Sequence, residues 1–348
     1  MHKEAMAMVI AWPETTARGD DRWYSVLKNM GLVKNLNFKV GHAAIVLIDK
    51  DTGILYYYDF GRYITPRGKG RARSCDTDPK LELTTKATIE NGKILNLEEI
   101  LLEMDVKKEA THGMGPMYFS ITDHLDFRQS KQEADKWVLI GSTPYGALAK
   151  GNNSCSRYVW QVFKAGKTKK TPDKWTSYLP HETLFPSPMS NVVNATSKRE
   201  LFIYDNKRLK KIVMNRWRSL LFFIQQVGHS FHPVKSKQLP DDQHLGYINE
   251  PVRPVNIPAE AQWLGGIGEG AWYHLEIEKG ICITSRFNHK GELEYKKRGA
   301  VKKDHLRYDD HQFQYDSHYL FTTLSIKGQI VRLHKIHSNE FILNEHST

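Results

Sequence analysis

Cys155 stands where a thiol gains reactivity, at the expected start of a helix. Apolar residues recur at helical spacing from 155 to 164, which predicts an amphipathic helix, and either Asn153 or Ser154 can cap its first turn. The positive end of the helix dipole favours the thiolate form of a cysteine. The backbone N–H of Cys155 is then free to point at a substrate oxyanion, so the pattern predicts a nucleophile for acyl chemistry.

A thiol nucleophile needs a base, and His42 is the candidate. It precedes an apolar run, Ala43–Ile48, that predicts a strand, and residues 49–53 have the composition of a turn before a second strand at 54–63. The two strands therefore predict an antiparallel hairpin. An imidazole beside the thiol would form the ion pair that makes a thiolate nucleophilic at neutral pH.

The third position of such a site falls on the second strand of the hairpin. The hairpin turn pairs His42 with residues 58–62. Side-chain parity leaves Asp59, Tyr58 and Arg62 open. We choose Asp59, because a carboxylate orients an imidazole best. The sequence thus predicts a cysteine, a histidine and an aspartate in one site.

Three motifs resemble those of the NlpC-type papain-fold hydrolases. The loop Gly141–Gly146 and the segment Asn153–Val159 look like that family's cysteine motif, and Val40–Val46 looks like its histidine strand. In this chain the histidine precedes the cysteine, an order similar to the circularly permuted branch, which includes lecithin–retinol acyltransferase-like proteins. The chain departs from the family at Ser154, where the motif has aspartate.

The resemblance implies an α+β, papain-like domain in which an antiparallel sheet packs on the cysteine helix. It also implies a thiol-dependent hydrolase, either a peptidase or an amidase, or an acyltransferase. Such an enzyme would use Cys155, His42 and Asp59 through a thioacyl intermediate and would need no cofactor. Tyr145 and Ser154 are expected near the substrate oxyanion. The expected partner is a peptide, amide or acyl substrate.

Two other classes of protein stay open. One is a binding module that keeps the fold and has lost catalysis, and the other is a basic nucleic-acid-binding protein, which the net charge of +11 invites. The densest basic runs are Lys164–Lys174 and Lys207–Arg218. The second run predicts a long helix over Lys207–Val227 with its basic residues facing solvent. The sequence has no zinc finger, KH loop or RNP motif, so nucleic-acid binding is not favoured.

The chain divides into three parts. Residues 1–230 mix helix and strand patterns, 231–258 is a proline-rich linker, and 259–348 carries only short strands separated by turns. This predicts a hydrolase domain followed by a small antiparallel β module. The glycine run Gly265–Gly270 leads into a strand rather than a helix, so it predicts a tight turn and not a phosphate-binding loop. Residues 66–73, rich in glycine and arginine, predict a loop.

The three cysteines rule out a disulfide scaffold, and their odd number leaves a thiol free. Residues 1–13 lack the features of a signal peptide, and no apolar run reaches the ~18 residues needed to cross a membrane. We therefore expect a cytoplasmic protein. The 16 histidines show no metal-ligand spacing, so no metal site is expected.

Overall fold

The computed structural model of the chain describes residues 3–18, 26, 29–31, 37–146, 152–171, 186–196, 200–232, 234, 235, 247–278, 281–300 and 310–336. The apolar spacing of residues 20–30 predicts a helix, but most of these residues lie outside the described ranges, as does the middle of the expected linker, 236–246.

The chain forms two compact units. The first comprises residues 1–61, 68–75 and 80–246, and the second comprises 62–67, 76–79 and 247–348. The second unit thus takes two short segments from the N-terminal half of the sequence. That residues 1–230 fold by themselves, as the sequence pattern indicates, stays a prediction.

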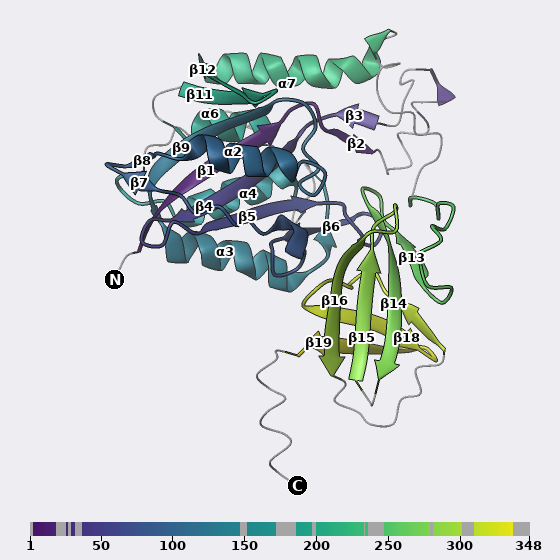
Figure 1. Ribbon diagram of the computed structural model, residues 1–348. Helices are drawn as coiled ribbons and strands as arrows, with labels where there is room; N and C mark the ends of the chain where they lie inside the picture. Colours follow the sequence, from purple (N-terminus) through teal and green to yellow (C-terminus); the bar gives the residue numbers. More distant parts are fainter. Residues whose placement is uncertain are drawn as a thin grey trace. The chain divides into compact units, whose positions relative to one another are not determined.

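The first unit is built on an eight-stranded sheet with the order β10-β6-β5-β4-β1-β9-β11-β12, in which all neighbours are antiparallel (Figure 1). Its strands are β1 (Glu4–Trp12), β4 (His42–Asp49), β5 (Leu55–Gly61), β6 (Lys69–Arg73), β9 (Met117–Asp126), β10 (Thr143–Pro144), β11 (Glu200–Asp205) and β12 (Arg208–Val213). Two small ribbons consist of β2 (Thr16–Arg18) with β3 (Asn37–Lys39) and β7 (Ile89–Glu90) with β8 (Lys93–Ile94). The expected hairpin of β4 and β5 is confirmed.

Helices cover both faces of this sheet. They are α2 (Leu97–Val106), α3 (Phe127–Ile140), α4 (Cys155–Ala165), α6 (Pro188–Asn194) and α7 (Arg216–Phe231), with a 3-10 turn at Pro79–Leu81. Side chains of α3, α4 and α6 pack on one face, and those of α2 pack on the other. The central strands β1 and β4 are therefore buried on both faces, which explains their near-continuous apolar sequences. No helix in the part of the chain that the structure describes is both long and apolar enough to cross a membrane.

The long helix expected at Lys207–Val227 is wrong in its first half. Residues 200–213 form the hairpin of β11 and β12, and α7 begins only at Arg216. Asn206 and Lys207 both have positive φ, which is the geometry of a two-residue hairpin turn. The lysines of β12 lie on the edge strand of the sheet, where charged side chains discourage pairing with another chain.

The loop expected at 66–73 is wrong in its second half. Lys69–Arg73 form β6, which pairs with β5 and sets Arg73 opposite Asp59. Two of the buried side chains of this strand, Arg71 and Arg73, are charged. Apolar alternation therefore could not reveal the strand in the sequence.

The second unit contains a seven-stranded antiparallel sheet with the order β13-β14-β15-β16-β19-β18-β17. Its strands are β13 (Gln262–Gly265), β14 (Gly270–Glu278), β15 (Ile281–Phe287), β16 (Leu293–Ala300), β17 (His311–Phe313), β18 (Phe321–Ile326) and β19 (Gln329–Lys335). The Gln262 amide joins the two edge strands, because it donates to the carbonyl of His311 and accepts from the N–H of Phe313. The sheet is thus nearly closed, and the C-terminal part is rich in strands as expected.

The glycine run at 265–270 connects β13 to β14, as the strand that follows it predicted. A side chain on Gly266 would meet the backbone of Tyr63, and one on Gly268 would meet the backbone of Arg62. The glycines therefore allow close packing of backbone inside the second unit, which is a structural reason for their presence.

Candidate active site

Cys155 and His42 are each the first residue of an element of the first unit, α4 for the cysteine and β4 for the histidine. The Cys155 thiol lies beside the His42 imidazole and the backbone N–H of Ala43, close enough for the thiol and the imidazole to shift each other's pKa. Cys155 and His42 are only 8% and 7% exposed. The structure therefore brings the expected thiol and imidazole together in a largely dry setting.

Asp59 reaches His42 from the neighbouring strand. In the register of β4 and β5, Asp59 pairs with Ala44, so it lies diagonal to His42 on the same face of the sheet. The distance from Asp59 Oδ2 to His42 Nε2 is 3.2 Å. Because Nε2 is engaged in this way, Nδ1 is the His42 nitrogen left to exchange a proton with the thiol.

The other two candidates for the third position have different surroundings. Tyr58 is next to Asp59 along β5 and so faces the opposite side of the sheet, where its hydroxyl donates to Asp135 at 2.8 Å. Arg62 belongs to the second unit, where its carbonyl accepts from the N–H of Gly268 at 2.7 Å. Among these three residues, Asp59 is therefore the one whose side chain orients the imidazole.

Two residues that the sequence did not indicate hold the Asp59 carboxylate. Arg73 donates from Nε to Oδ1 at 3.0 Å and from a terminal nitrogen to Oδ2 at 2.7 Å. The Tyr57 hydroxyl donates to Oδ2 at 2.9 Å. The side chains of Asp59 and Arg73 are fully buried, and such charges are tolerated inside a protein when they are paired and hydrogen-bonded as here.

These contacts set the charge of the acid and of the base. Burial alone would raise the pKa of Asp59, but the positive charge of Arg73 and the hydrogen bond with His42 lower that pKa, so the carboxylate stays ionised. Burial alone would lower the pKa of His42, yet the hydrogen bonds with Asp59 and Cys155 raise it to about 9. The imidazole is therefore protonated at neutral pH.

The pKa of Cys155 is lowered, whereas the pKa of His42 is raised. Burial raises the pKa of the Cys155 thiol, but the hydrogen bond and the charge of His42, helped by Ser156 and the Ala43 N–H, lower it overall. The arrangement thus favours a thiolate–imidazolium ion pair at neutral pH. A thiolate of this kind is the form of cysteine that attacks carbonyl carbon.

The start of α4 supplies backbone donors beside the thiol. Ser154 is the N-cap of the two candidates, and its hydroxyl accepts from the N–H of Arg157 at 3.2 Å. Asn153 in turn accepts from the N–H of Ser154 at 3.0 Å. Helix geometry leaves the N–H groups of Cys155 and Ser156 without an intrahelical acceptor. Such groups can bind an oxyanion, whereas the Ser154 hydroxyl already caps the helix and its expected oxyanion role stays a prediction.

Tyr145 lies in the loop before α4. Its ring stacks on Phe60, with centroids 6.1 Å apart and planes at 10°, and its backbone forms a bridge with Asn153. These contacts hold Tyr145 next to the residues that precede the cysteine helix. The expected role of the Tyr145 hydroxyl at an oxyanion stays a prediction.

Trp12 packs against the imidazole of His42. The two residues are partners across β1 and β4, and their rings stack with centroids 5.9 Å apart and planes at 14°. Gly113 lies close to the indole, because a methyl carbon on this glycine would come within 2.5 Å of Nε1 of Trp12. Trp12 therefore restricts the orientations that the His42 ring can adopt.

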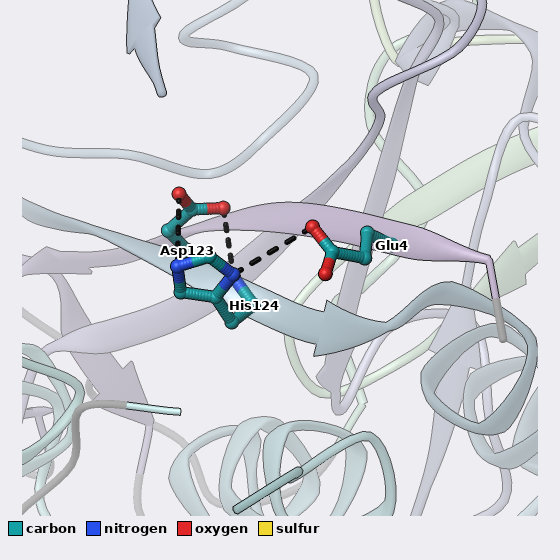
Figure 2. Close-up of side chains that lie close together, drawn as sticks. All are labelled: Glu4, Asp123 and His124. Carbon is teal, nitrogen blue, oxygen red and sulfur yellow. Dashed lines mark hydrogen bonds and ion pairs between the residues drawn. The ribbon is translucent and has the colours of Figure 1, made fainter. Parts of the chain in front are cut away.

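A group of possible metal ligands lies away from Cys155 and His42, where the register of β1 and β9 shifts. Atoms of Glu4, Asp123 and His124 lie within 4.8 Å of one another, and Figure 2 shows the three side chains directed toward each other. The Lys50 ammonium lies 3.0 Å from Glu4 and also bonds Asp123. The register shift brings these side chains close together, and Lys50 offsets the negative charge of the two carboxylates. The cluster therefore has a structural explanation without a metal ion. The expectation that the chain binds no metal stays a prediction.

Comparisons with known proteins match two separate stretches of the chain. Residues 7–171 match the family model described as type VI secretion system effector TseH-like, and residues 261–336 match the model of the DUF6695 C-terminal domain. Among solved structures, the crystal structure of the type VI secretion system effector TseH matches with 17% identity and a TM-score of 0.39, covering 60% of this chain and 98% of that one. None of the curated proteins matches this chain. The N-terminal part is thus similar to TseH-like effectors over just under half of the chain.

Proposed function

We propose that the chain is a thiol-dependent hydrolase of amide or acyl bonds, or an acyltransferase, with a papain-like domain of the permuted NlpC type. The observation that carries this proposal is the position of Cys155 beside His42, whose Nε2 lies 3.2 Å from the Asp59 carboxylate. A cysteine with a purely structural role would not need a buried base, an acid that orients this base, and helix N–H groups without an intrahelical acceptor around it. The match of residues 7–171 to the TseH-like effectors covers all three side chains and supports the proposal.

The first half of the reaction forms a thioacyl enzyme. The Cys155 thiolate attacks the carbonyl carbon, a C–S bond forms, and the carbonyl π electrons move to oxygen. The N–H of Cys155 donates to this oxyanion. As the oxyanion collapses, the His42 imidazolium gives its proton to the leaving amine or alcohol, and the bond from carbon to that group breaks.

The second half releases the acyl group. The neutral His42 takes a proton from water, or from the alcohol or amine of an acceptor, while the oxygen or nitrogen of that molecule attacks the thioester carbon. The C–S bond then breaks and Cys155 leaves as a thiolate beside the protonated imidazole. Hydrolase and transferase differ only in which molecule attacks in this step.

Asp59 and Arg73 act through His42 rather than on the substrate. Because Asp59 accepts from Nε2, the ring keeps Nδ1 toward the thiol in both protonation states. Arg73 binds both carboxylate oxygens and so prevents Asp59 from rotating away. Arg73 is thus proposed as a positioning residue.

The comparisons also bear on where the protein acts. The family description for residues 7–171 names a secretion-system effector. We propose export from the producing cell as an alternative to the cytoplasmic location expected from the sequence. In that case a peptide, a cell-wall peptide or a lipid acyl group outside the producing cell is the substrate class to test first.

Trapping of the acyl-enzyme tests the proposal. The full-length chain is incubated with activated peptide esters and with acyl esters, and its intact mass is followed by rapid quenching. We expect a mass increase equal to the acyl group, mapped to Cys155 and removed by hydroxylamine, and none in the Cys155→Ala variant. If Cys155 is never acylated while the folded chain still binds such ligands, the chain is a binding module and the proposal is wrong.

A further inference from the structure

The outer side of α7 carries an apolar stripe that no part of the proposed reaction uses. Trp217, Leu221 and Ile224 are 63%, 57% and 55% exposed. Their spacing keeps the stripe within about 60° of the helix circumference. Phe231, at the end of the helix, is not part of the stripe, because its ring packs against that of Phe38. Single exposed apolar residues are common on proteins, but an aligned row on one helix face marks an interaction surface.

The opposite side of α7 explains why this helix is held in place. Phe222 packs against the core of the first unit and its ring lies 5.9 Å from that of Tyr118. Ser219 is fully buried on the same side. The helix is therefore anchored by one face while it presents Trp217, Leu221 and Ile224 outward. The exposed stripe is therefore distinct from the face of α7 that packs against the core of the first unit.

Positive charge surrounds the stripe. Residues 206–232 contain six lysines and arginines and no acidic residue. Arg216 and Arg218 lie about 100° to either side of Trp217 around the helix axis. The neighbouring edge strand β12 adds Arg208 and Lys210 on one face, whereas Lys211 alternates to the other face and pairs with Glu200 at 2.9 Å. An apolar row bordered on both sides by cations matches the interface of an anionic bilayer, in which acyl chains lie beneath negative headgroups.

We propose that this stripe docks the protein on an anionic membrane surface, with Trp217, Leu221 and Ile224 inserted below the headgroups and the flanking cations among the phosphates. The helix has 16 residues, which is shorter than the ~20 needed to span a bilayer. It therefore lies in the plane of the interface. The inference is independent of the proposed function, because none of these residues contacts Cys155 or His42.

Vesicle co-sedimentation of the full-length chain tests the docking. We expect binding to vesicles of mixed phosphatidylcholine and phosphatidylglycerol and little binding to phosphatidylcholine alone. Arg208→Gln combined with Lys210→Gln should weaken binding about tenfold, as should Leu221→Gln combined with Ile224→Gln. Val252→Gln combined with Val255→Gln, two exposed apolar residues of the second unit, is the matched control and should bind normally. The Cys155→Ala variant should also bind normally.

Insertion has its own readout. Brominated lipids quench tryptophans that enter the acyl region, so they should quench the wild type, and the Trp217→Phe variant should bind while losing that quenching. Absence of binding to anionic vesicles, or equal binding by the stripe variant and the control, would overturn the proposal. A dimer in solution that Leu221→Gln dissociates, without any vesicle binding, would instead assign the stripe to a second copy of the chain.

Discussion

Arg73 and Asp59 form a bidentate ion pair across neighbouring strands with both side chains removed from solvent. The two residues are direct partners in the register of β5 and β6, so the pairing of these strands brings the two side chains together. The Oδ2 atom of Asp59 also accepts from His42 and from Tyr57. The contacts of Asp59 therefore both stabilise the first unit and orient the His42 imidazole.

Removing Arg73 should be among the most damaging single changes in the first unit. Arg73→Met removes the bidentate cation from the buried Asp59 carboxylate and leaves it the His42 imidazolium. Breaking a buried ion pair in this way costs about 3–5 kcal/mol of unfolding free energy. Arg73→Lys keeps the charge and loses the two-pronged geometry, so it should cost less. Urea unfolding measures both. Arg128→Met, at an exposed position of α3, is the matched control and should change stability by no more than about 0.5 kcal/mol. An Arg73→Met variant as stable as this control would contradict the role given to the pair.

Replacing Asp59 should lower the pKa of His42. The value of about 9 depends on the hydrogen bond with Asp59 and on its charge, and in Asp59→Asn the Arg73 cation would also repel the imidazolium. NMR titration of the imidazole signal, assigned with His42→Gln, measures the shift. Because Asp59→Asn removes the carboxylate that faces the Arg73 cation, Asp59→Asn with Arg73→Met provides a second variant without either charge. A His42 pKa that stays near 9 in both variants would show that Asp59 does not set it.

The pH dependence of turnover should separate the two partners. Turnover needs the thiolate and the imidazolium together, so it should fall in acid, as the lowered pKa of Cys155 is crossed, and in alkali, as His42 loses its proton near pH 9. Alkylation of Cys155 needs only the thiolate and should not fall at the alkaline end. Parallel profiles for the two reactions at high pH would exclude His42 as the proton donor.

Crowding Trp12 should disturb His42 without touching the site itself. In Gly113→Ala the added carbon would lie 2.5 Å from Nε1 of Trp12, and overpacking of this kind costs about 1–3 kcal/mol. The displaced indole should release the His42 ring and slow the alkylation of Cys155. Gly228→Ala is the matched control, since a side chain there meets nothing within 4 Å and stabilises the helix by up to about 1 kcal/mol. If Gly113→Ala lowers stability while alkylation keeps its rate, Trp12 does not position the base.

Limited proteolysis should cut first between His229 and Gln262 without freeing a folded β module. The second unit includes Ile64 in its core, and Asp78 accepts from Arg286 at 3.2 Å within the same unit. A cut in the linker therefore leaves two pieces of this unit on the N-terminal fragment. We expect the nicked fragments to elute together in native gel filtration and to separate in denaturant. A C-terminal fragment that elutes alone and folded would contradict this.

The sequence predicted the β4–β5 hairpin and α4 because each follows one dominant period. In the hairpin, apolar runs flank a turn containing Gly53, which has positive φ, and in α4 the apolar face repeats at helical spacing. The chemistry of the site followed from these two elements, because hairpin register and helix start fix where Asp59, His42 and Cys155 lie. Their joint role in catalysis stays a prediction.

What could not be predicted rests on contacts between segments. β6 has no apolar alternation because its buried Arg73 is stabilised by a carboxylate from another strand, and periodicity does not record such a partner. Residues 208–213 form β12 although lysine and arginine favour helices, because the turn at Asn206 and Lys207 outweighs that preference. One signal was available, since a buried acid needs a cation nearby, and Arg73 follows Asp59 by 14 residues.

The pH profile of alkylation at Cys155 tests the central claim most directly. The full-length chain is treated with iodoacetamide across a range of pH, and the modification of Cys155, Cys75 and Cys282 is quantified by peptide mass spectrometry. The ion pair predicts that Cys155 reacts fastest and stays reactive into mildly acidic pH, and that His42→Gln moves its profile toward the ordinary thiol pKa of about 8.5. If Cys155 reacts no faster than the other two cysteines, or if His42→Gln leaves its profile unchanged, the thiolate–imidazolium pair does not exist.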